Sequence, residues 1–120
     1  MYNGTYNKAV YWNSEIENLV NTKLSNRYTL TCGYHARQRI NENGLPQGVY
    51  KASLYGDVVE CEFVDGCVHK VITRLPHNSK PYDICFAVMF NDDVAFVKTV
   101  WLNSSTDNHS TIRKENYKIS

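Results

Sequence analysis

The sequence predicts an α+β domain in which N-terminal helices pack on a four-stranded antiparallel meander sheet. Three observations favour this class. Apolar residues follow helical spacing as far as Leu54, whereas from Asp57 onward they follow alternating or continuous extended patterns. The dipeptide Asp65-Gly66 lies between two alternating runs, which is a strong signal for a tight hairpin. Helices that precede all the long strands favour α+β over a parallel α/β sheet.

The length and composition predict a single domain over residues 1–120. A chain of 120 residues with 42% hydrophobic residues can bury one core but not two. We expect a loosely held lead-in over residues 1–12, a helical part over 13–56, and a sheet with a C-terminal loop over 57–120. The net charge of +1 gives no bulk attraction to nucleic acid, so any RNA binding must depend on local clusters of Lys and Arg.

The first predicted helix covers residues 14–24. Ser14 is a favourable N-cap, and Glu17 completes a capping box three residues later. Its apolar stripe suits a helix that lies on a sheet, and consists of Ile16, Leu19, Val20 and Leu24.

Three further segments complete the helical part. Residues 28–32 form a short extended piece, after which Gly33 releases the chain into a second helix over 34–42, ended by Asn43-Gly44. Pro46 suits the first turn of a third helix over 46–54, which Gly56 stops.

Two hairpins make up the predicted sheet. Residues 58–64 and 67–74 pair across Asp65-Gly66, which places Glu62 opposite His69 as a cross-strand ion pair. Residues 82–90 and 94–102 pair around residues 91–93, and their apolar character on both faces indicates the most covered strands. Between the hairpins, residues 75–81 form an exposed loop with a solvated His77.

The cysteines predict a cytoplasmic protein with reduced thiols. Cys32, Cys61, Cys67 and Cys85 form no CxxC pair, and no leader with an apolar core precedes them. A zinc site can be drawn on paper from Cys32, His35, Cys67 and His69, but structural zinc motifs have tighter spacing, so we expect no metal and no cofactor. No apolar run approaches the roughly 20 residues of a membrane span.

Candidate catalytic and phosphate-binding side chains occur together in two segments of the sequence. Residues 103–111 form a polar loop after the last strand, and within it His109 titrates near neutrality. His35 and Arg39 are four residues apart and share one face of the second helix. The alternative is that the loop is a solvated connection, that His35 is a helix-start histidine, and that the arginines are solvated charges.

These two segments carry a resemblance to a known group. The run His-Ala-Arg-Gln-Arg at 35–39, followed by Asn-Gly-Leu at 43–45, resembles the helix of small RelE- and BrnT-like toxin domains. The run from Trp101 to Tyr117, with Asp107, His109, Ser110 and Thr111, is similar to the C-terminal motif of contact-dependent and polymorphic toxin domains. Both belong to the BECR ribonucleases (barnase, EndoU, colicin, RelE). The resemblance covers residues 29–117, but the family helix often ends in Arg-Gly-Ile, so one cation is absent here.

The resemblance implies a BECR/RelE-like fold and a toxin that hydrolyses RNA. It implies metal-independent cleavage by histidine acid and base catalysis, which leaves a 2′,3′-cyclic phosphate. The catalytic residues carried over are His35, His109, Arg39, Thr111 and Tyr117, and the substrate-binding residues are Lys98, Ser110 and Arg37. The expected partners are RNA and a cognate inhibitor, either an immunity protein or an antitoxin.

The competing interpretation is a non-enzymatic protein-binding module or inhibitor on the same fold. Near-neutral charge and nine tyrosines favour it, because Tyr supplies adaptable contact area. The two interpretations differ in one respect: catalysis requires His35 and His109 in one cleft with a cation beside them.

Overall fold

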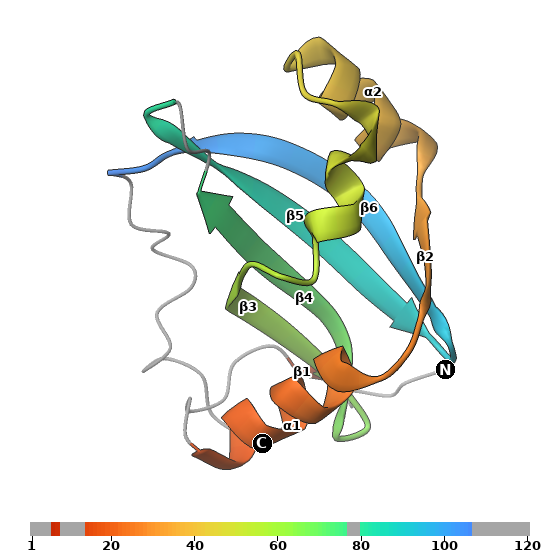
Figure 1. Cartoon of the computed structure of the whole chain (residues 1–120). Helices are drawn as coiled ribbons and strands as arrows, with labels where there is room; N and C mark the ends of the chain where they lie inside the picture. The colour runs from red at the N-terminus through yellow and green to blue at the C-terminus, as the bar shows by residue number, and fades with distance from the viewer. Residues whose placement is uncertain (1–5, 8–13, 77–79, 107–120) are drawn as a thin grey trace.

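The structure, a computed structural model, describes residues 6–7, 14–76 and 80–106, and within these ranges it contains one six-stranded sheet (Figure 1). The strand order is β1-β3-β4-β5-β6-β2. In chain order the elements are β1 (Tyr6–Asn7), α1 (Ser14–Ser25), β2 (Thr29–Cys32), α2 (Tyr34–Glu42), the 3₁₀ helix η1 (Gln47–Ala52), β3 (Asp57–Val64), β4 (Cys67–Pro76), β5 (Tyr82–Asn91) and β6 (Val94–Ser104).

The α+β class is confirmed, but the sheet is larger than the predicted one. Strands β3 to β6 form the expected antiparallel meander. The short β2 extends it by pairing parallel to β6, and the two-residue β1 extends it by pairing antiparallel to β3. The extended piece predicted over residues 28–32 is therefore present, but the expectation of a purely antiparallel sheet of four strands, without this segment, was wrong. A four-residue edge strand with one neighbour has too few positions to show a sequence period of its own.

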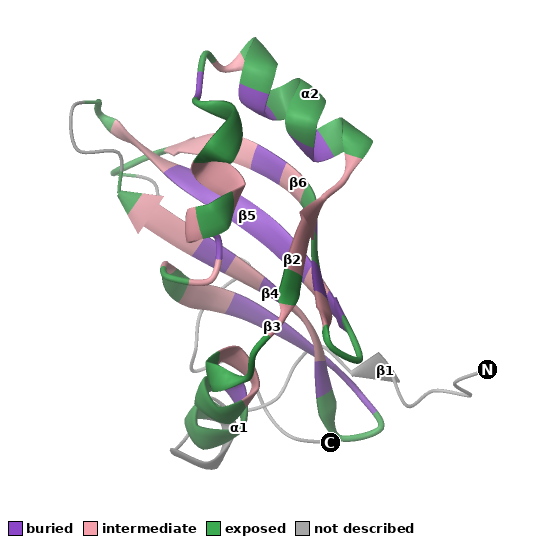
Figure 2. Ribbon diagram, turned by 45° about the vertical axis from the view of Figure 1, so that its right-hand side comes forward, coloured by how far each residue is buried: buried purple, intermediate pink, exposed green. Residues whose placement is uncertain are grey.

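Both predicted hairpins are confirmed. Asp65 and Gly66 have φ angles of 51° and 77°, the pair of positive values that a type I′ turn requires. The second turn consists of Asp92 and Asp93, and Asp92 has a φ of 52°. In the β5 strand that follows the first hairpin, residues 84–88 are all buried, as expected for a central strand (Figure 2).

The predicted pairing of Glu62 with His69 was wrong, because a β-bulge shifts the register. Phe63 pairs with Val68, but Glu62 pairs with Lys70, so His69 is the extra residue on β4. The ion pair consequently joins Lys70 Nζ to Glu62 Oε2 at 3.8 Å.

The third helix lies where it was predicted but is shorter and tighter. It is a 3₁₀ helix held by bonds from Val49 N to Pro46 O and from Ser53 N to Tyr50 O, both 3.0 Å. Gly48 within this segment weakens α-helix formation, which favours the shorter 3₁₀ turn. The first two helices match their predicted ranges closely.

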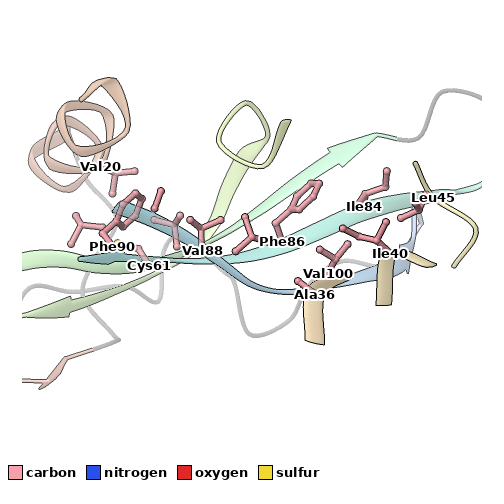
Figure 3. Close-up of a cluster of buried hydrophobic side chains, with 14 of the residues drawn as sticks. Val20, Ala36, Ile40, Leu45, Cys61, Ile84, Phe86, Val88, Phe90 and Val100 are labelled. Atoms are coloured by element: carbon pink, nitrogen blue, oxygen red, sulfur yellow. The ribbon is translucent and has the colours of Figure 1, made fainter. Parts of the chain in front are cut away.

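The core lies between the sheet and the helices, which Figure 1 shows in front of the sheet. From α1 it receives Val20, and from α2 it receives Ala36 and Ile40, all nearly inaccessible to solvent. Figure 3 shows these side chains beside Phe86, Val88 and Val100 of the central strands. None of the helices in the described ranges is both long and apolar enough to span a membrane.

Candidate functional site

The start of α2 is fixed against β6 by Gly33. Its N–H donates to the carbonyl of Val97 at 2.9 Å, which extends the pairing of β2 with β6 up to the first turn of the helix. A Cβ atom at this position would lie 2.6 Å from the Phe96 ring, so glycine is favoured by close approach rather than by its backbone angles. The helix that carries His35 therefore begins at a defined point beside β6.

The packing of α2 determines which of its side chains are available. Ala36 and Ile40 face the core, so the side that carries His35 and Arg39 faces solvent. The His35 ring makes an edge contact with the Tyr34 ring, with centroids 5.9 Å apart. Tyr34 is 77% exposed, so both rings are accessible from outside.

Arg39 is accessible but is already paired. Its Nη1 lies 3.0 Å from Oε1 of Glu42, and both side chains are about half exposed or more. Exposed pairs of this kind contribute on the order of 0–1 kcal/mol, so a phosphate could replace the Glu42 carboxylate at little cost.

Arg37 points toward the 3₁₀ helix rather than toward His35. Its guanidinium carbon lies 5.4 Å from the centroid of the Tyr50 ring, and its carbonyl accepts a bond from Gln47 Nε2 at 3.4 Å. Arg37 thus joins α2 to η1 and remains exposed.

Lys98, predicted to bind substrate, is exposed for a structural reason. Ala87 pairs with Thr99 and Val88 pairs with Val97, so Lys98 is the extra residue of a β-bulge on β6. Lys98 faces solvent by the alternation of β6, in which Ala95 and Val97 are buried whereas Phe96 and Lys98 are exposed, and the bulge makes Val100 rather than Thr99 the next buried residue. This explains a lysine inside an otherwise apolar strand.

The remaining predicted site residues, His109, Ser110, Thr111 and Tyr117, lie outside the described residues, as does His77. The pairing of His35 with His109 therefore stays a prediction. What the structure does describe is the end of β6, from which the chain continues toward His109.

The end of β6 is anchored by a polar cluster that the sequence did not reveal. Arg74 Nε lies 2.6 Å from Asp83 Oδ2, and Arg74 Nη2 donates to the carbonyl of Ser104 at 2.8 Å. The backbone N–H and the hydroxyl of Ser105 both donate to the Pro81 carbonyl, at 3.1 and 3.0 Å. The register of β4 with β5 brings Arg74 diagonally across from Asp83, and only that register could have identified the pair.

Charge is divided between the two parts of the chain. Residues 14–56, which contain the helices, carry three acidic groups (Glu15, Glu17 and Glu42) against five basic ones, Lys23, Arg27, Arg37, Arg39 and Lys51. Residues 57–106 carry four basic groups against seven acidic ones, Asp57, Glu60, Glu62, Asp65, Asp83, Asp92 and Asp93. The helical part is therefore cationic although the whole chain is nearly neutral.

Among the residues that the structure describes, the cysteine side chains form neither a disulfide nor a metal site. All four thiols are free. Burial raises the pKa of Cys61 to about 12 and that of Cys85 to about 11, so both remain neutral thiols. Within the described ranges no three His, Cys, Asp or Glu side chains come together as metal ligands.

Comparisons with protein-family models, with curated proteins and with solved structures found no match to this chain. The functional assignment consequently depends on the residues and on the geometry described above.

Proposed function

We propose that this chain is a metal-independent endoribonuclease of the BECR type that acts as a cytoplasmic toxin. The observation that supports this most is the cationic helical part, which presents an exposed His35 one helical turn before an exposed Arg39. Such a surface attracts a phosphate backbone even though the net charge of the chain is only +1.

The proposed reaction uses two imidazoles. One removes the proton from the ribose 2′-hydroxyl, whose oxygen then attacks the neighbouring phosphorus. The bond from phosphorus to the 5′-oxygen breaks, and the second imidazole, in its protonated form, gives its proton to the leaving oxygen. We assign these roles to His35 and His109. The products are a 2′,3′-cyclic phosphate and a 5′-hydroxyl.

The other proposed site residues stabilise charge and hold the substrate. The Arg39 guanidinium would exchange the Glu42 carboxylate for two phosphate oxygens, which its planar fork suits. Thr111 and Ser110 would supply hydroxyl donors, and Tyr117 a ring or hydroxyl contact. Lys98 and Arg37 add exposed positive charge on β6 and α2.

The architecture agrees with this proposal in one respect. The helix with the His-Ala-Arg-Gln-Arg run precedes an antiparallel meander of four strands, the order that the resemblance to BECR and RelE-like domains implies. A cognate immunity protein or antitoxin would be the expected protein partner of such a toxin.

The second candidate is a non-enzymatic module that binds another protein. Four large apolar or aromatic side chains favour it because they are exposed in the described part of the chain: Leu19, Tyr34, Tyr55 and Phe96. Aromatic residues are enriched in protein interfaces.

The test is an RNA-cleavage assay with analysis of the product ends. We expect wild-type protein to produce 2′,3′-cyclic phosphate ends, at a rate that excess chelator does not change and that has a bell-shaped pH dependence. His109→Ala should reduce the rate by about 10²- to 10⁴-fold, whereas His77→Ala should have no effect. RNA left intact by wild-type protein, or products ending in a 3′-hydroxyl, would exclude the proposed reaction.

A further inference from the structure

A cavity of about 300 Å³ opens between α1, β2 and η1, apart from the residues assigned to cleavage. Its size lies at the small end of ligand cavities, which measure roughly 300–1,000 Å³. Asn26, which follows α1, lines the cavity together with Leu24, Tyr28, Leu30, Lys51, Leu54 and Tyr55. All are among the described residues.

Two tyrosines give the cavity one fixed ring and one open ring. The Tyr28 hydroxyl donates to the carbonyl of Lys23 at 2.6 Å, and its ring packs against Phe90 with centroids 5.0 Å apart. Burial raises the pKa of Tyr28, so the hydroxyl stays protonated as that bond requires. Tyr55 is 83% exposed, which leaves its ring available for stacking. Open aromatic rings are the usual platforms for unpaired nucleic-acid bases.

The wall that carries Tyr55 is held to the sheet. Thr73 on β4 donates its hydroxyl to the carbonyl of Ser53, and both residues are inaccessible to solvent. The chain from Ser53 to Tyr55 is therefore fixed at one end, although Tyr55 itself projects outward. A ring on a fixed backbone loses little freedom when a base stacks on it.

The charge around this cavity suits an anionic ligand. Lys51 lines it, and no carboxylate does. The neighbouring cavity of about 210 Å³ shares Leu24 but is lined by Glu17 and Asp57, so a polyanion would not extend in that direction.

Two larger cavities do not have this combination of rings and charge. One, of about 530 Å³, has Lys23 but no aromatic residue in its lining. The other, of about 630 Å³, has aromatic residues and Asp92 but no lysine or arginine. A base with its phosphate therefore fits the 300 Å³ cavity better than either.

The 3₁₀ helix η1 lies between the cavity and α2 and contacts both. Lys51 follows Tyr50 in η1, and Tyr50 lies under the Arg37 guanidinium at 5.4 Å from ring centroid to guanidinium carbon. Arg37 belongs to the helix that also carries His35 and Arg39. A single strand seated in the cavity can thus follow η1 as far as Arg37 on α2, the helix that also carries the residues proposed to cut it.

From these observations we infer that this cavity is a base-binding subsite for single-stranded RNA. An unpaired base stacks on Tyr55, and Lys51 contacts the adjoining phosphate. The choice of RNA as ligand rests on the proposed function. The inference is nevertheless separate from it, because the subsite should bind RNA whether or not the RNA is cut.

The test is therefore a binding titration with RNA that cannot be cut. A fluorescent 2′-O-methyl oligouridine of about eight nucleotides lacks the free 2′-hydroxyl needed for cleavage. Tyr55→Ala should weaken its binding by roughly 5- to 100-fold, the loss of affinity usual when one base can no longer stack on an aromatic ring. Tyr55→Phe keeps the ring and should bind like wild type. Lys51→Glu should weaken binding. It should also reduce the slope of the logarithm of the binding constant against the logarithm of the salt concentration by about one or more.

Two controls distinguish binding at this subsite from nonspecific electrostatic attraction of the RNA. Lys80→Glu makes the same charge change at an exposed lysine between β4 and β5, and should have a much smaller effect. An abasic oligomer of the same length keeps the phosphates, so Tyr55→Ala should not change its binding. Equal losses for Lys51→Glu and Lys80→Glu, or a Tyr55→Ala loss that persists with the abasic oligomer, would overturn the subsite.

The outcome also distinguishes this inference from the proposed function. If the analogue binds through Tyr55 but ordinary RNA is not cut, the subsite stands and the ribonuclease proposal fails. If ordinary RNA is cut but Tyr55→Ala binds the analogue normally, the subsite alone fails. Absence of binding by wild-type protein even at low salt contradicts the subsite directly.

Discussion

Arg39 stands one helical turn after His35, and its guanidinium is held by the Glu42 carboxylate at 3.0 Å. In the proposed role, Arg39 releases the Glu42 carboxylate and binds a phosphate of the RNA. Because both side chains are exposed, solvent already screens the pair, and the exchange costs little. The residue is thus placed where a phosphate can reach it without disturbing the core.

Substitutions at this pair test that role. Arg39→Lys keeps the positive charge but loses the planar fork, so we expect an intermediate loss of cleavage rate, and Arg39→Ala should lose more. Glu42→Gln removes the competing carboxylate and should leave the rate unchanged or slightly higher. Rates of RNA cleavage at low substrate concentration measure all three. Wild-type rates for both Arg39 variants would show that Arg39 is only a solvated charge.

Lys98 and His69 show why the sequence alone could not predict the cross-strand partners of every residue. Each is the extra residue of a β-bulge, Lys98 on β6 and His69 on β4. A bulge depends on how two strands pair, and strand pairing is not encoded by the local alternation of either strand. The alternation predicted both strands correctly and still misplaced the partner of Glu62.

At the scale of elements, the position of α2 depends on the contact between Gly33 and Phe96. A Cβ atom at Gly33 would meet the end of the Phe96 ring, which is 39% exposed and has room to move outward. A helix start that is displaced there would also displace His35, two residues later.

Gly33→Ala should therefore destabilise the protein modestly and slow cleavage. We expect a loss of about 1 kcal/mol in the free energy of unfolding, at the lower end for overpacking, because the ring can shift. Urea denaturation measures it. In a Phe96→Ala background the same substitution should cost little, since the obstructing ring is gone. An equal cost in both backgrounds would mean that the ring does not set the start of α2.

The elements that could be predicted are those with strong local signals. The Asp65-Gly66 turn, the Gly33 start and the Asn43-Gly44 end of α2 are each specified by a few adjacent residues. The parallel pairing of β2 with β6 joins residues 29–32 to 94–97, and no local sequence pattern predicts a pairing between segments so far apart in the chain. The polar cluster of Arg74, Asp83 and Ser104 was missed for the same reason, since its members come from three strands.

At the scale of the whole molecule, the division of charge matters more than the net charge of +1. A nearly neutral total argued against RNA binding, but the helical part is basic and the sheet part is acidic. The sequence contains this division and a count by segment would have found it. It could not show that Tyr50 of η1 lies against the basic helix α2, because that follows from the contact of the Arg37 guanidinium with the Tyr50 ring.

The central claim is that His35 and His109 act together on one phosphate, and a double-mutant cycle of cleavage rates tests it most directly. His35→Ala and His109→Ala should each reduce the rate by about 10²- to 10⁴-fold, with folding retained in urea denaturation because His35 is exposed. If the two act as a unit, the double variant should be hardly slower than the slower single variant. Losses that multiply in the double variant, or single variants that cleave like wild type, would contradict the claim.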